Sequence, residues 1–277
     1  MRGAKKNRFP IVLQIAMLLL GLVFLFPIYL TFVNSLKTYD QVMLHPAALP
    51  NPPQFVNYAT VWVQIDYLRA FINTFIITVG SIAGIILVSS LGAYKLVRSP
   101  GKLSGAIFLI ILSAMVVPFH ALMIPLVKVA NFFGFVDNPI GIILIYVGFG
   151  IPFAVFLYHG FIKGVPIELE EAAAIDGCGA FRTFFVIVFP LLKNITFTVM
   201  VLDVLWIWND FMLPLLLITT QEKRTLTLSY FFYFGQYVNQ WHMALAALSM
   251  SIVTAIIFYL FAQKYIVQGI ADGAIKG

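Results

Sequence analysis

The sequence predicts an all-α integral membrane protein with six transmembrane helices and one polar insert that folds as a helix–turn–helix. Of its 277 residues, 61% are hydrophobic and only 10% are charged, whereas a typical soluble domain carries about 25% charged residues. Apolar runs of the ~20 residues needed to cross a bilayer recur along the chain. A charged segment at 162–194 stands between two of these runs. We therefore expect residues 1–277 to form a single membrane domain.

The six expected spans are ordered along the chain as separate apolar segments: 11–33, 70–92, 105–126, 139–161, 195–219 and 244–262. Basic residues precede the first of them, as in a signal peptide. Its apolar run exceeds the 7–15 residues of a signal-peptide core, so we expect a retained anchor. Residues 263–277 would then form a C-terminal tail.

The distribution of basic residues predicts the orientation of the chain. If the N-terminus is cytoplasmic, twelve of the 17 Lys and Arg residues lie on the cytoplasmic side. The others are Lys37, Arg69, Lys128, Lys223 and Arg224. The positive-inside rule therefore predicts that both termini, the tail and the insert lie in the cytoplasm. The net charge of +6 reflects this topology, and no nucleic-acid partner is expected.

The insert at 162–194 predicts two short helices. Pro166 suits a first helical position because its missing N–H costs nothing there, and Gly177 supplies a natural C-terminal stop. These signals predict a helix over Ile167–Asp176, and a second, amphipathic helix from about 180 to 189 that stops at Pro190. Acidic residues favoured by the helix dipole fill the first turns of the first helix: Glu168, Glu170 and Glu171.

One face of the first expected helix carries small residues. Spacings of three and four place four side chains together: Leu169, Ala172, Ala173 and Asp176. Alanines on this face would let another surface approach closely. From the pattern alone, a docking knob and an ordinary connecting loop both remain open.

The insert resembles the EAA motif of bacterial ABC importer permeases, whose pattern is Glu-Ala-Ala, Gly, Ile and Leu-Pro at fixed spacing. The residues in register are Glu171, Ala172, Ala173, Gly177, Ile187 and Pro190. Phe189 stands where the pattern has Leu. The resemblance implies that these residues, with Glu168 and Asp176, form a cytoplasmic coupling loop that docks on an ATPase subunit.

Further resemblances narrow the family. Trp208-Asn209-Asp210-Phe211 resembles the fifth-span signature of carbohydrate-uptake permeases, and Asn73-Thr74 resembles the same group. The tail at 269–277 is similar to that of the second, six-span permease subunit of maltose-type sugar importers. The resemblance implies a bacterial or archaeal cell membrane location and four partners: a second permease, an ATPase dimer, an extracytoplasmic sugar-binding protein and the lipid bilayer. It also implies that the loop at 220–243 reaches toward the binding protein.

The sequence lacks the motifs of an enzyme. Gly101-Lys102 is followed by Leu103 and does not complete a phosphate loop. No catalytic motif or paired histidine metal site is found, so we expect no enzymatic activity, metal or cofactor in this chain. ATP and Mg would be bound by the partner ATPase subunits.

The candidate translocation-path residues are polar or aromatic: Asn73, Asp203, Trp206, Trp208, Asn209 and Asp210. Asp203 and Asp210 are seven residues apart and should share a helix face with Trp206. A carboxylate in a membrane faces protein or water, so both should turn away from lipid. They would either line the path or hold the helix bundle together.

Two other functions remain open. An importer for a non-sugar solute, such as a phosphorylated polyol or a polyamine, fits the same coupling loop. A proton-coupled secondary transporter could use Asp203 or Asp210 as its proton carrier. Such transporters usually contain repeated spans, and no repeat is visible here.

Overall fold

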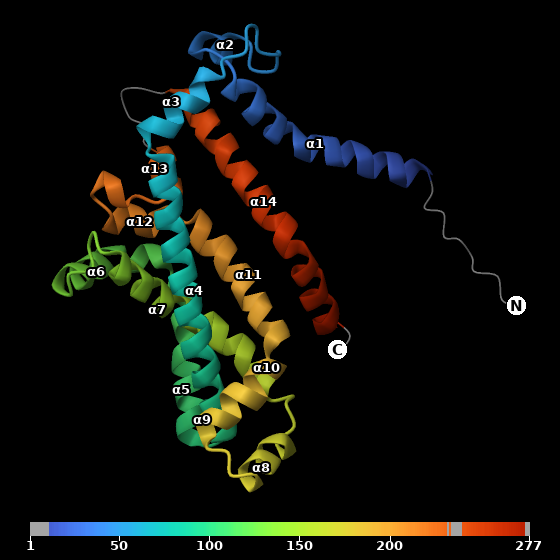
Figure 1. The fold of residues 1–277 in the computed structure, drawn as a ribbon, viewed down its shortest axis with the longest axis vertical. Coiled ribbons are helices and arrows are strands. Elements are labelled where there is room, and N and C mark those ends of the chain that lie inside the picture. Colours follow the sequence, from blue (N-terminus) through green and yellow to red (C-terminus); the bar gives the residue numbers. More distant parts are fainter. Residues whose placement is uncertain (1–10, 232, 234–239, 275–277) are drawn as a thin grey trace, which may run out of the picture. The chain divides into compact units, whose positions relative to one another are not determined.

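The computed structural model describes residues 11–231, 233 and 240–274, which fold into helices joined by loops (Figure 1). The expected all-α fold is confirmed. The predictions for the basic N-terminal residues, for 232 and 234–239 of the outer loop and for 275–277 of the tail lie outside the described residues.

The long helices and their neighbours follow the order of the predicted spans: α1 (Ile11–Ser35), α2 (Tyr39–Leu44), α3 (Val56–Gln64), α4 (Tyr67–Arg98), α5 (Lys102–Ser113), η1 (Ala114–Val116), α6 (Phe119–Phe132) and α7 (Pro139–Ile162). The second half of the chain contains α8 (Glu168–Ile175), α9 (Ala180–Thr183), η2 (Phe184–Val188), α10 (Phe189–Leu191), α11 (Lys193–Asn209), α12 (Met212–Leu217), η3 (Gln221–Lys223), α13 (Leu226–Phe231) and α14 (Trp241–Ala274).

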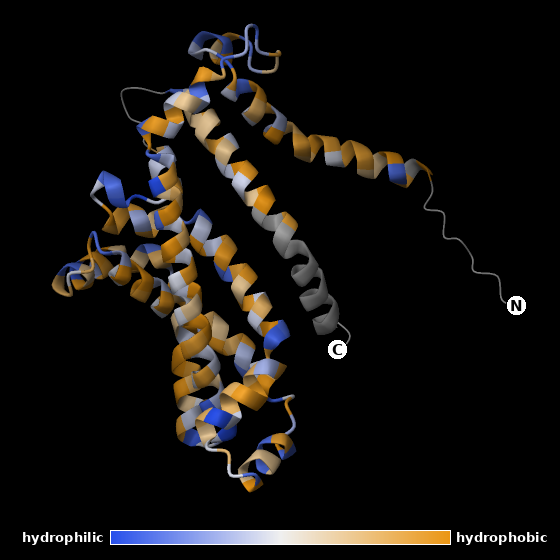
Figure 2. Cartoon of the chain, viewed as in Figure 1, coloured by the Kyte–Doolittle hydropathy of each residue, from blue (hydrophilic) through white to orange (hydrophobic). Residues whose placement is uncertain are grey.

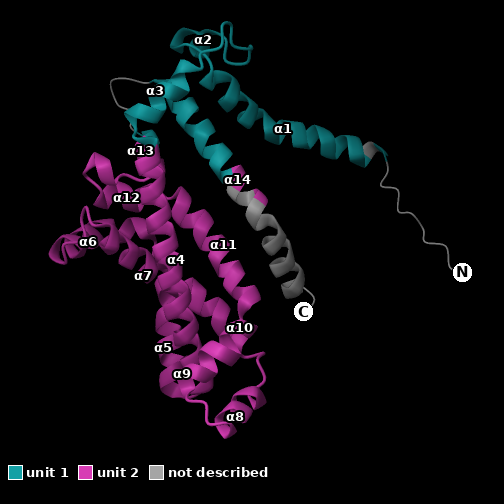
Figure 3. Ribbon diagram, in the orientation of Figure 1, with its two compact units in different colours: residues 1–67, 230–255 teal, residues 68–229, 256–277 magenta. Residues whose placement is uncertain are grey.

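The chain divides into two compact units, coloured separately in Figure 3. Unit 1 contains residues 1–67 and 230–255, and unit 2 contains residues 68–229 and 256–277. The insert at 162–194 and all six candidate path residues belong to unit 2.

Three described helices are each long and apolar enough to cross a membrane: the first from Leu13 to Ser35, then α4 and α7. Hydrophobic residues cover most of α1 (Figure 2). Two further pairs of consecutive helices pass the same test only when the two helices of a pair are taken together. In each pair the helices are bent by more than 40° at a short break. A shorter apolar helix, Trp241–Ile257, matches the start of the sixth expected span.

The third expected span, 105–126, is not one straight helix. Its two halves, Lys102–Val116 and Phe119–Phe132, meet at 104°. Pro118 explains the break, since proline lacks an N–H and disfavours helical geometry in the residue before it. Val117 is accordingly extended, with φ −76° and ψ 117°.

The fifth expected span, 195–219, is also interrupted. The helix α11 starts at Lys193 and is bent by 76° from the preceding Ala180–Leu191 segment. It ends at Asn209, and Asp210 is extended before the short α12 begins. The prediction did not anticipate the interruption at Asp210, and Pro214 lies within α12.

Glycines bring α4 and α7 into close contact within unit 2. A Cβ atom at Gly80 would lie 2.7 Å from Cδ1 of Ile143, and one at Gly84 would lie 2.5 Å from Cγ2 of Val147. A larger residue at Gly84 would have to displace the stiff Val147 side chain, and one at Gly80 would have to displace the end of the Ile143 side chain. The G-x-x-x-G pair therefore acts as a packing device between membrane helices.

In unit 1, a buried lysine organises the loop after α1. The Lys37 ammonium donates to Oδ1 of Asn34 (3.0 Å) and to the carbonyls of His45 (2.7 Å) and Pro46 (3.1 Å). Asn57 donates to the carbonyl of Lys37 at 2.9 Å. These bonds satisfy the charge, while burial lowers the pKa of Lys37. They hold the loop before α3 in a single arrangement.

Candidate functional site

The first helix of the insert forms close to its predicted bounds, but Pro166 lies before the N-cap residue Ile167 and not at a first helical position. The helix α8 covers Glu168–Ile175, with three acids in its first turn. Gly177 has φ +80°, and its N–H donates to the Ala174 carbonyl at 3.1 Å. The Cys178 N–H donates to the Ala173 carbonyl at 2.9 Å. This pair of bonds is a Schellman stop, which requires a residue in the left-handed region at Gly177.

The exposed face of α8 differs in part from the predicted face. Ala173 is only 4% exposed, so its side chain is not part of the exposed face of α8. The predicted residues that are exposed are Glu168, Leu169, Glu171, Ala172 and Asp176. Two apolar side chains that the sequence analysis did not select are also strongly exposed in this segment, Ile175 at 88% and Phe181 at 74%.

The second helical piece is longer and less regular than predicted. It runs from α9 through the π-helical turn η2 to α10 and ends at Leu191, not before Pro190. The proline ring would clash with the carbonyl of Val186, four positions earlier, which favours an opened turn. Ile187 is half-buried within this turn, and Pro190 is exposed.

Glu170, which the sequence analysis treated only as a helix-dipole acid, makes specific contacts in the folded chain. It turns inward: Oε1 accepts from Nε of Arg98 at 2.7 Å, and Oε2 accepts from the Tyr94 hydroxyl at 2.7 Å. Nη2 of Arg98 also donates to the Val165 carbonyl at 2.9 Å. No short-range signal could have found this contact, because its partners lie more than 70 residues away.

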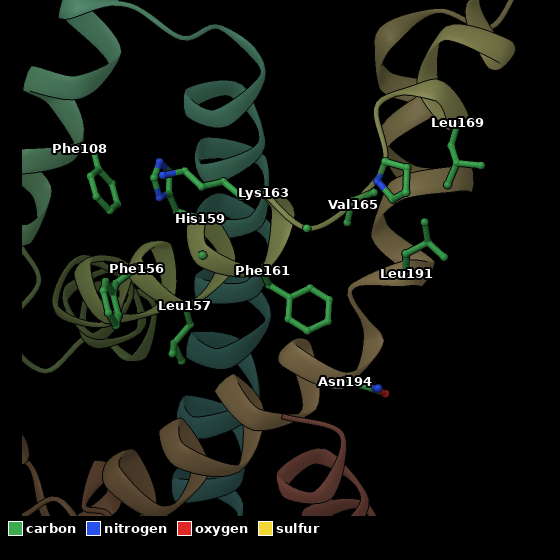
Figure 4. A pocket seen from close by; sticks show the side chains of 13 residues that line it. Phe108, Phe156, Leu157, His159, Phe161, Lys163, Val165, Leu169, Leu191 and Asn194 are labelled. Carbon is green, nitrogen blue, oxygen red and sulfur yellow. The ribbon is translucent and has the colours of Figure 1, made fainter. Parts of the chain in front are cut away.

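An open hollow of about 910 Å³ is lined in part by the 163–169 segment. In Figure 4, Phe108, His159 and Lys163 lie on one side of this hollow, and Leu169 and Leu191 lie on the other. The His159 ring stacks on the Phe108 ring at 3.8 Å. The hollow therefore separates α8 from the part of unit 2 that is formed by α5 and α7.

Asp210 is fully engaged by its own chain. Its carboxylate accepts from the Tyr146 hydroxyl at 2.8 Å and from the N–H groups of Met212 (3.0 Å) and Leu213 (3.4 Å). The last two bonds cap the start of α12. The Tyr146 ring meets the Trp206 ring edge-on at 5.7 Å. Tyr146, which the sequence analysis missed, thus joins two of the predicted path residues.

No hydrogen bond among the described residues joins Asp203 to the Asp210 and Tyr146 pair. Asp203 is 5% exposed, and its Oδ2 accepts no hydrogen bond from any residue that the structure describes. Both carboxylates therefore turn toward protein, as predicted. They do not share one continuous helix face, because Asp210 lies beyond the end of α11.

The remaining path candidates are divided between structural and exposed positions. Asn73 donates to the carbonyls of Glu222 (2.9 Å) and Arg224 (3.1 Å) and anchors the loop after α12. The Trp208 ring packs against the Phe71 ring at 5.6 Å. The exposed side chains of the predicted path set are Trp206, at 41%, and Asn209.

A second side chain, the carboxylate of Asp137, holds the same loop. Asp137, between α6 and α7, accepts from the N–H groups of Thr219 and Thr220, each at 2.9 Å, and from the Thr219 hydroxyl. Its carbonyl accepts from the Lys223 ammonium at 2.6 Å. Burial alone would raise the pKa of Asp137, but the bonds from Thr219 and Thr220 outweigh it and lower the pKa from 3.8 to about 2.

We expect Asp137→Ala to loosen this loop. A hydrogen bond to a charged group contributes ~1.5 kcal/mol or more, so amide exchange at Thr219 and Thr220 should rise by about tenfold. Glu222→Gln, an exposed change in the same loop, should leave these rates unchanged. Since the folded pKa lies below the unfolded value, the Asp137 bonds should be complete above pH 3.8 and be lost as the pH falls through about 2. Unchanged exchange in Asp137→Ala would contradict this role.

Comparison with known proteins places these features in a family. Residues 76–272 match the family described as "Binding-protein-dependent transport system inner membrane component". The "Probable starch degradation products transport system permease protein AmyC" of Thermoanaerobacterium thermosulfurigenes is 42% identical, over 94% of both chains. The "Melibiose/raffinose/stachyose import permease protein MelC" of Bacillus subtilis is 36% identical over the full length of both chains.

A solved structure shares the fold. It is described as the crystal structure of a bacterial ABC transporter involved in the import of the acidic polysaccharide alginate. The TM-score is 0.79, with 24% identity, and the match covers 96% of this chain and 99% of the other. This similarity supports the fold over nearly its whole length.

Proposed function

The chain belongs to the family of binding-protein-dependent transport system inner membrane components, and we propose that the solute it helps to import is a sugar or oligosaccharide. It is a multi-pass inner membrane protein and the permease subunit of an ABC importer, not an enzyme. Membership of this family removes the proton-coupled secondary transporter from consideration.

The observation that carries the sugar assignment is the agreement between relatives that cover almost the entire chain. The relative with 42% identity is named for starch degradation products, and a second is named for melibiose, raffinose and stachyose. Their similarity extends through the membrane helices as well as the insert. The path available to the solute is therefore expected to suit a carbohydrate.

An ABC importer permease works with ATPase and binding-protein partners. Our finer proposal is a second permease subunit, an ATPase dimer and an extracytoplasmic sugar-binding protein. Both termini and the 162–194 segment lie in the cytoplasm in this proposal. Its support is the excess of Lys and Arg on that side.

The docking part of the proposal is α8 with the turn that follows it. The support is physical: Ile175 and Phe181 expose large apolar side chains on a short helical knob, flanked by the exposed Glu168, Glu171 and Asp176. Apolar side chains at the centre of a polar rim are typical of protein interfaces. ATP-driven movement of the partner would then move α8 and, through it, the membrane helices.

For the solute, the best candidate in this chain is Trp206. This residue is 41% exposed and its ring packs edge-on against the Tyr146 ring, so it offers an apolar face, with the exposed Asn209 nearby in sequence. Asp210 and Asn73 would have an indirect, structural role, since their polar groups hold α12 and the loop that follows it.

The test is transport by the assembled importer in proteoliposomes. We expect uptake of labelled maltooligosaccharides or raffinose to require ATP and to continue when a protonophore collapses the proton gradient. Omission of this chain should abolish uptake, and this chain alone should not hydrolyse ATP because it has no phosphate loop. Transport of glycerol 3-phosphate or spermidine in place of sugars would contradict the sugar assignment.

A further inference from the structure

The contact between α4 and α8 links the candidate coupling knob to a membrane helix that does not adjoin it in the chain. Both oxygens of Glu170 are occupied, one by Nε of Arg98 and the other by the Tyr94 hydroxyl, each at 2.7 Å. The Arg98 and Glu170 side chains are only 16% and 11% exposed. Short, charge-assisted bonds shielded from water are stronger and more directional than surface ion pairs.

Glu170 differs from its acidic neighbours in the same turn. Glu168 and Glu171 are exposed, whereas the Glu170 side chain is largely buried and points toward α4. All three acids suit the start of a helix, so the dipole does not explain why one of them turns inward. The specific partners on α4 do explain it.

Tyr94 extends the same contact to the second half of the insert. Its ring lies 5.0 Å from the ring of Phe184 in the π-helical turn η2. Phe184 is only 1% exposed and also packs near Phe189, at 5.8 Å. The last turns of α4 therefore touch both α8 and the segment that leads into α11.

The chain segments on either side of α8 contain glycines and hold it less firmly than its contacts with α4. The segment before it contains Gly164 and borders the open hollow, and the segment after it contains Gly177 and Gly179. The Arg98 bond to the Val165 carbonyl at 2.9 Å fixes the first of these segments to α4 as well. Without the contacts from α4, a displacement of α8 could be absorbed by these short segments.

We propose that Tyr94, Arg98 and Glu170 form a latch that positions α8 on the end of α4, so that displacement of α8 is transmitted directly into α4. The latch consists of positioning residues, not of residues that touch the transported solute. This inference rests on the proposed docking of α8 on an ATPase. The helices α7 and α11 adjoin the insert in the chain. The latch would add α4 as a third helix through which movement of α8 reaches the membrane.

The experiment measures ATP hydrolysis and sugar uptake in the same reconstituted importer. Disrupting the latch with Glu170→Gln or Arg98→Ala should leave ATPase assembly and hydrolysis in place. Uptake per ATP hydrolysed should fall by at least about fivefold, the lower end of typical coupling between sites. Tyr94→Phe keeps the ring against Phe184 but removes the hydroxyl, and a smaller loss is expected.

Two controls separate transmission from simple damage. Lys95→Gln removes an exposed positive charge from the same part of α4 and should leave the ratio unchanged. The charge exchange Arg98→Glu with Glu170→Arg should recover part of the ratio that either single change loses, because the pair is restored in reverse. The combined Glu170→Gln and Arg98→Ala variant should be no worse than the more severe single variant.

The outcomes distinguish this inference from the proposed function. Absence of ATP-dependent sugar uptake in the unaltered importer would overturn the proposed function itself. Coupled uptake in the unaltered importer together with a normal ratio in both Glu170→Gln and Arg98→Ala would overturn the latch alone. Loss of ATPase assembly in Glu170→Gln would also overturn it, because the residue would then act at the partner surface or in folding.

Discussion

Gly177→Leu is expected to abolish most transport in the assembled importer while leaving sugar capture by the binding protein intact. Gly177 has φ +80°, a left-handed conformation that costs an ordinary L-residue ~1–2 kcal/mol. That penalty would lower the equilibrium constant that favours the native turn over other conformations by about tenfold, since 1.4 kcal/mol corresponds to a factor of ten. The turn sets the direction of the segment from α9 to α10, so α8 and the following helix would no longer present one surface.

The matched control is Gly177→Asn. Asparagine visits the left-handed region more readily than leucine, and a Cβ atom at this position would meet open space within the chain. Asn should therefore retain much of the transport, which would be measured as ATP-dependent uptake in proteoliposomes. Equal loss in both variants would indicate that any side chain here obstructs the partner. Full transport by Gly177→Leu would exclude the proposed role of the turn.

The knob could be predicted from sequence because its signals are local. Pro166 before α8 and Gly177 after it act within one turn of the helix ends that they define. The inward direction of Glu170 could not be predicted in this way, because it depends on Arg98, which is 72 residues earlier in the chain. The same limit applies to Ala173, whose burial results from packing within the folded insert.

The membrane spans likewise have features that the sequence predicted and features that it did not. Hydropathy located all six apolar segments, and α1 and α7 closely match their predicted bounds. Hydropathy does not register a bend, however, because a single proline such as Pro118 has little effect on an average taken over a long apolar segment. The breaks near Pro118 and Asp210 follow from backbone hydrogen bonding, which an average over ~20 residues does not record.

The candidate path was predicted as a single helix stripe, and the end of α11 explains why the structure differs. Asp210 leaves the helix and uses its carboxylate on the N–H groups of Met212 and Leu213. Spacing alone treats a residue at the helix end as though the helix continued. Tyr146 was missed because a tyrosine within an apolar span is not distinctive until its hydroxyl partner is known.

Removal of the Asp210 carboxylate and removal of the Asp203 carboxylate should have different effects on the thermal stability of the protein. Asp210→Leu would delete a helix cap, which costs ~1 kcal/mol. It would also leave the Tyr146 hydroxyl, on a side chain that is 1% exposed, without its acceptor, at a cost of about 1–3 kcal/mol. We expect a clear fall in the thermal stability of the solubilised importer and a loss of transport. Asp210→Asn should lose less, since an amide can still pair with the tyrosine hydroxyl and accept one backbone N–H.

Asp203→Leu should instead leave thermal stability unchanged or raise it. Asp203 is 5% exposed, and its Oδ2 has no hydrogen-bond partner among the described residues. A carboxylate within a membrane helix costs at least ~2.5 kcal/mol on insertion scales, and leucine would remove that cost. Thermal unfolding of the Asp203 and Asp210 variants in one detergent gives the comparison, with uptake measured in parallel. A fall in stability as large as that of Asp210→Leu would show that Asp203 has an unrecognised partner, whereas raised stability with reduced uptake would mark its carboxylate as retained for transport.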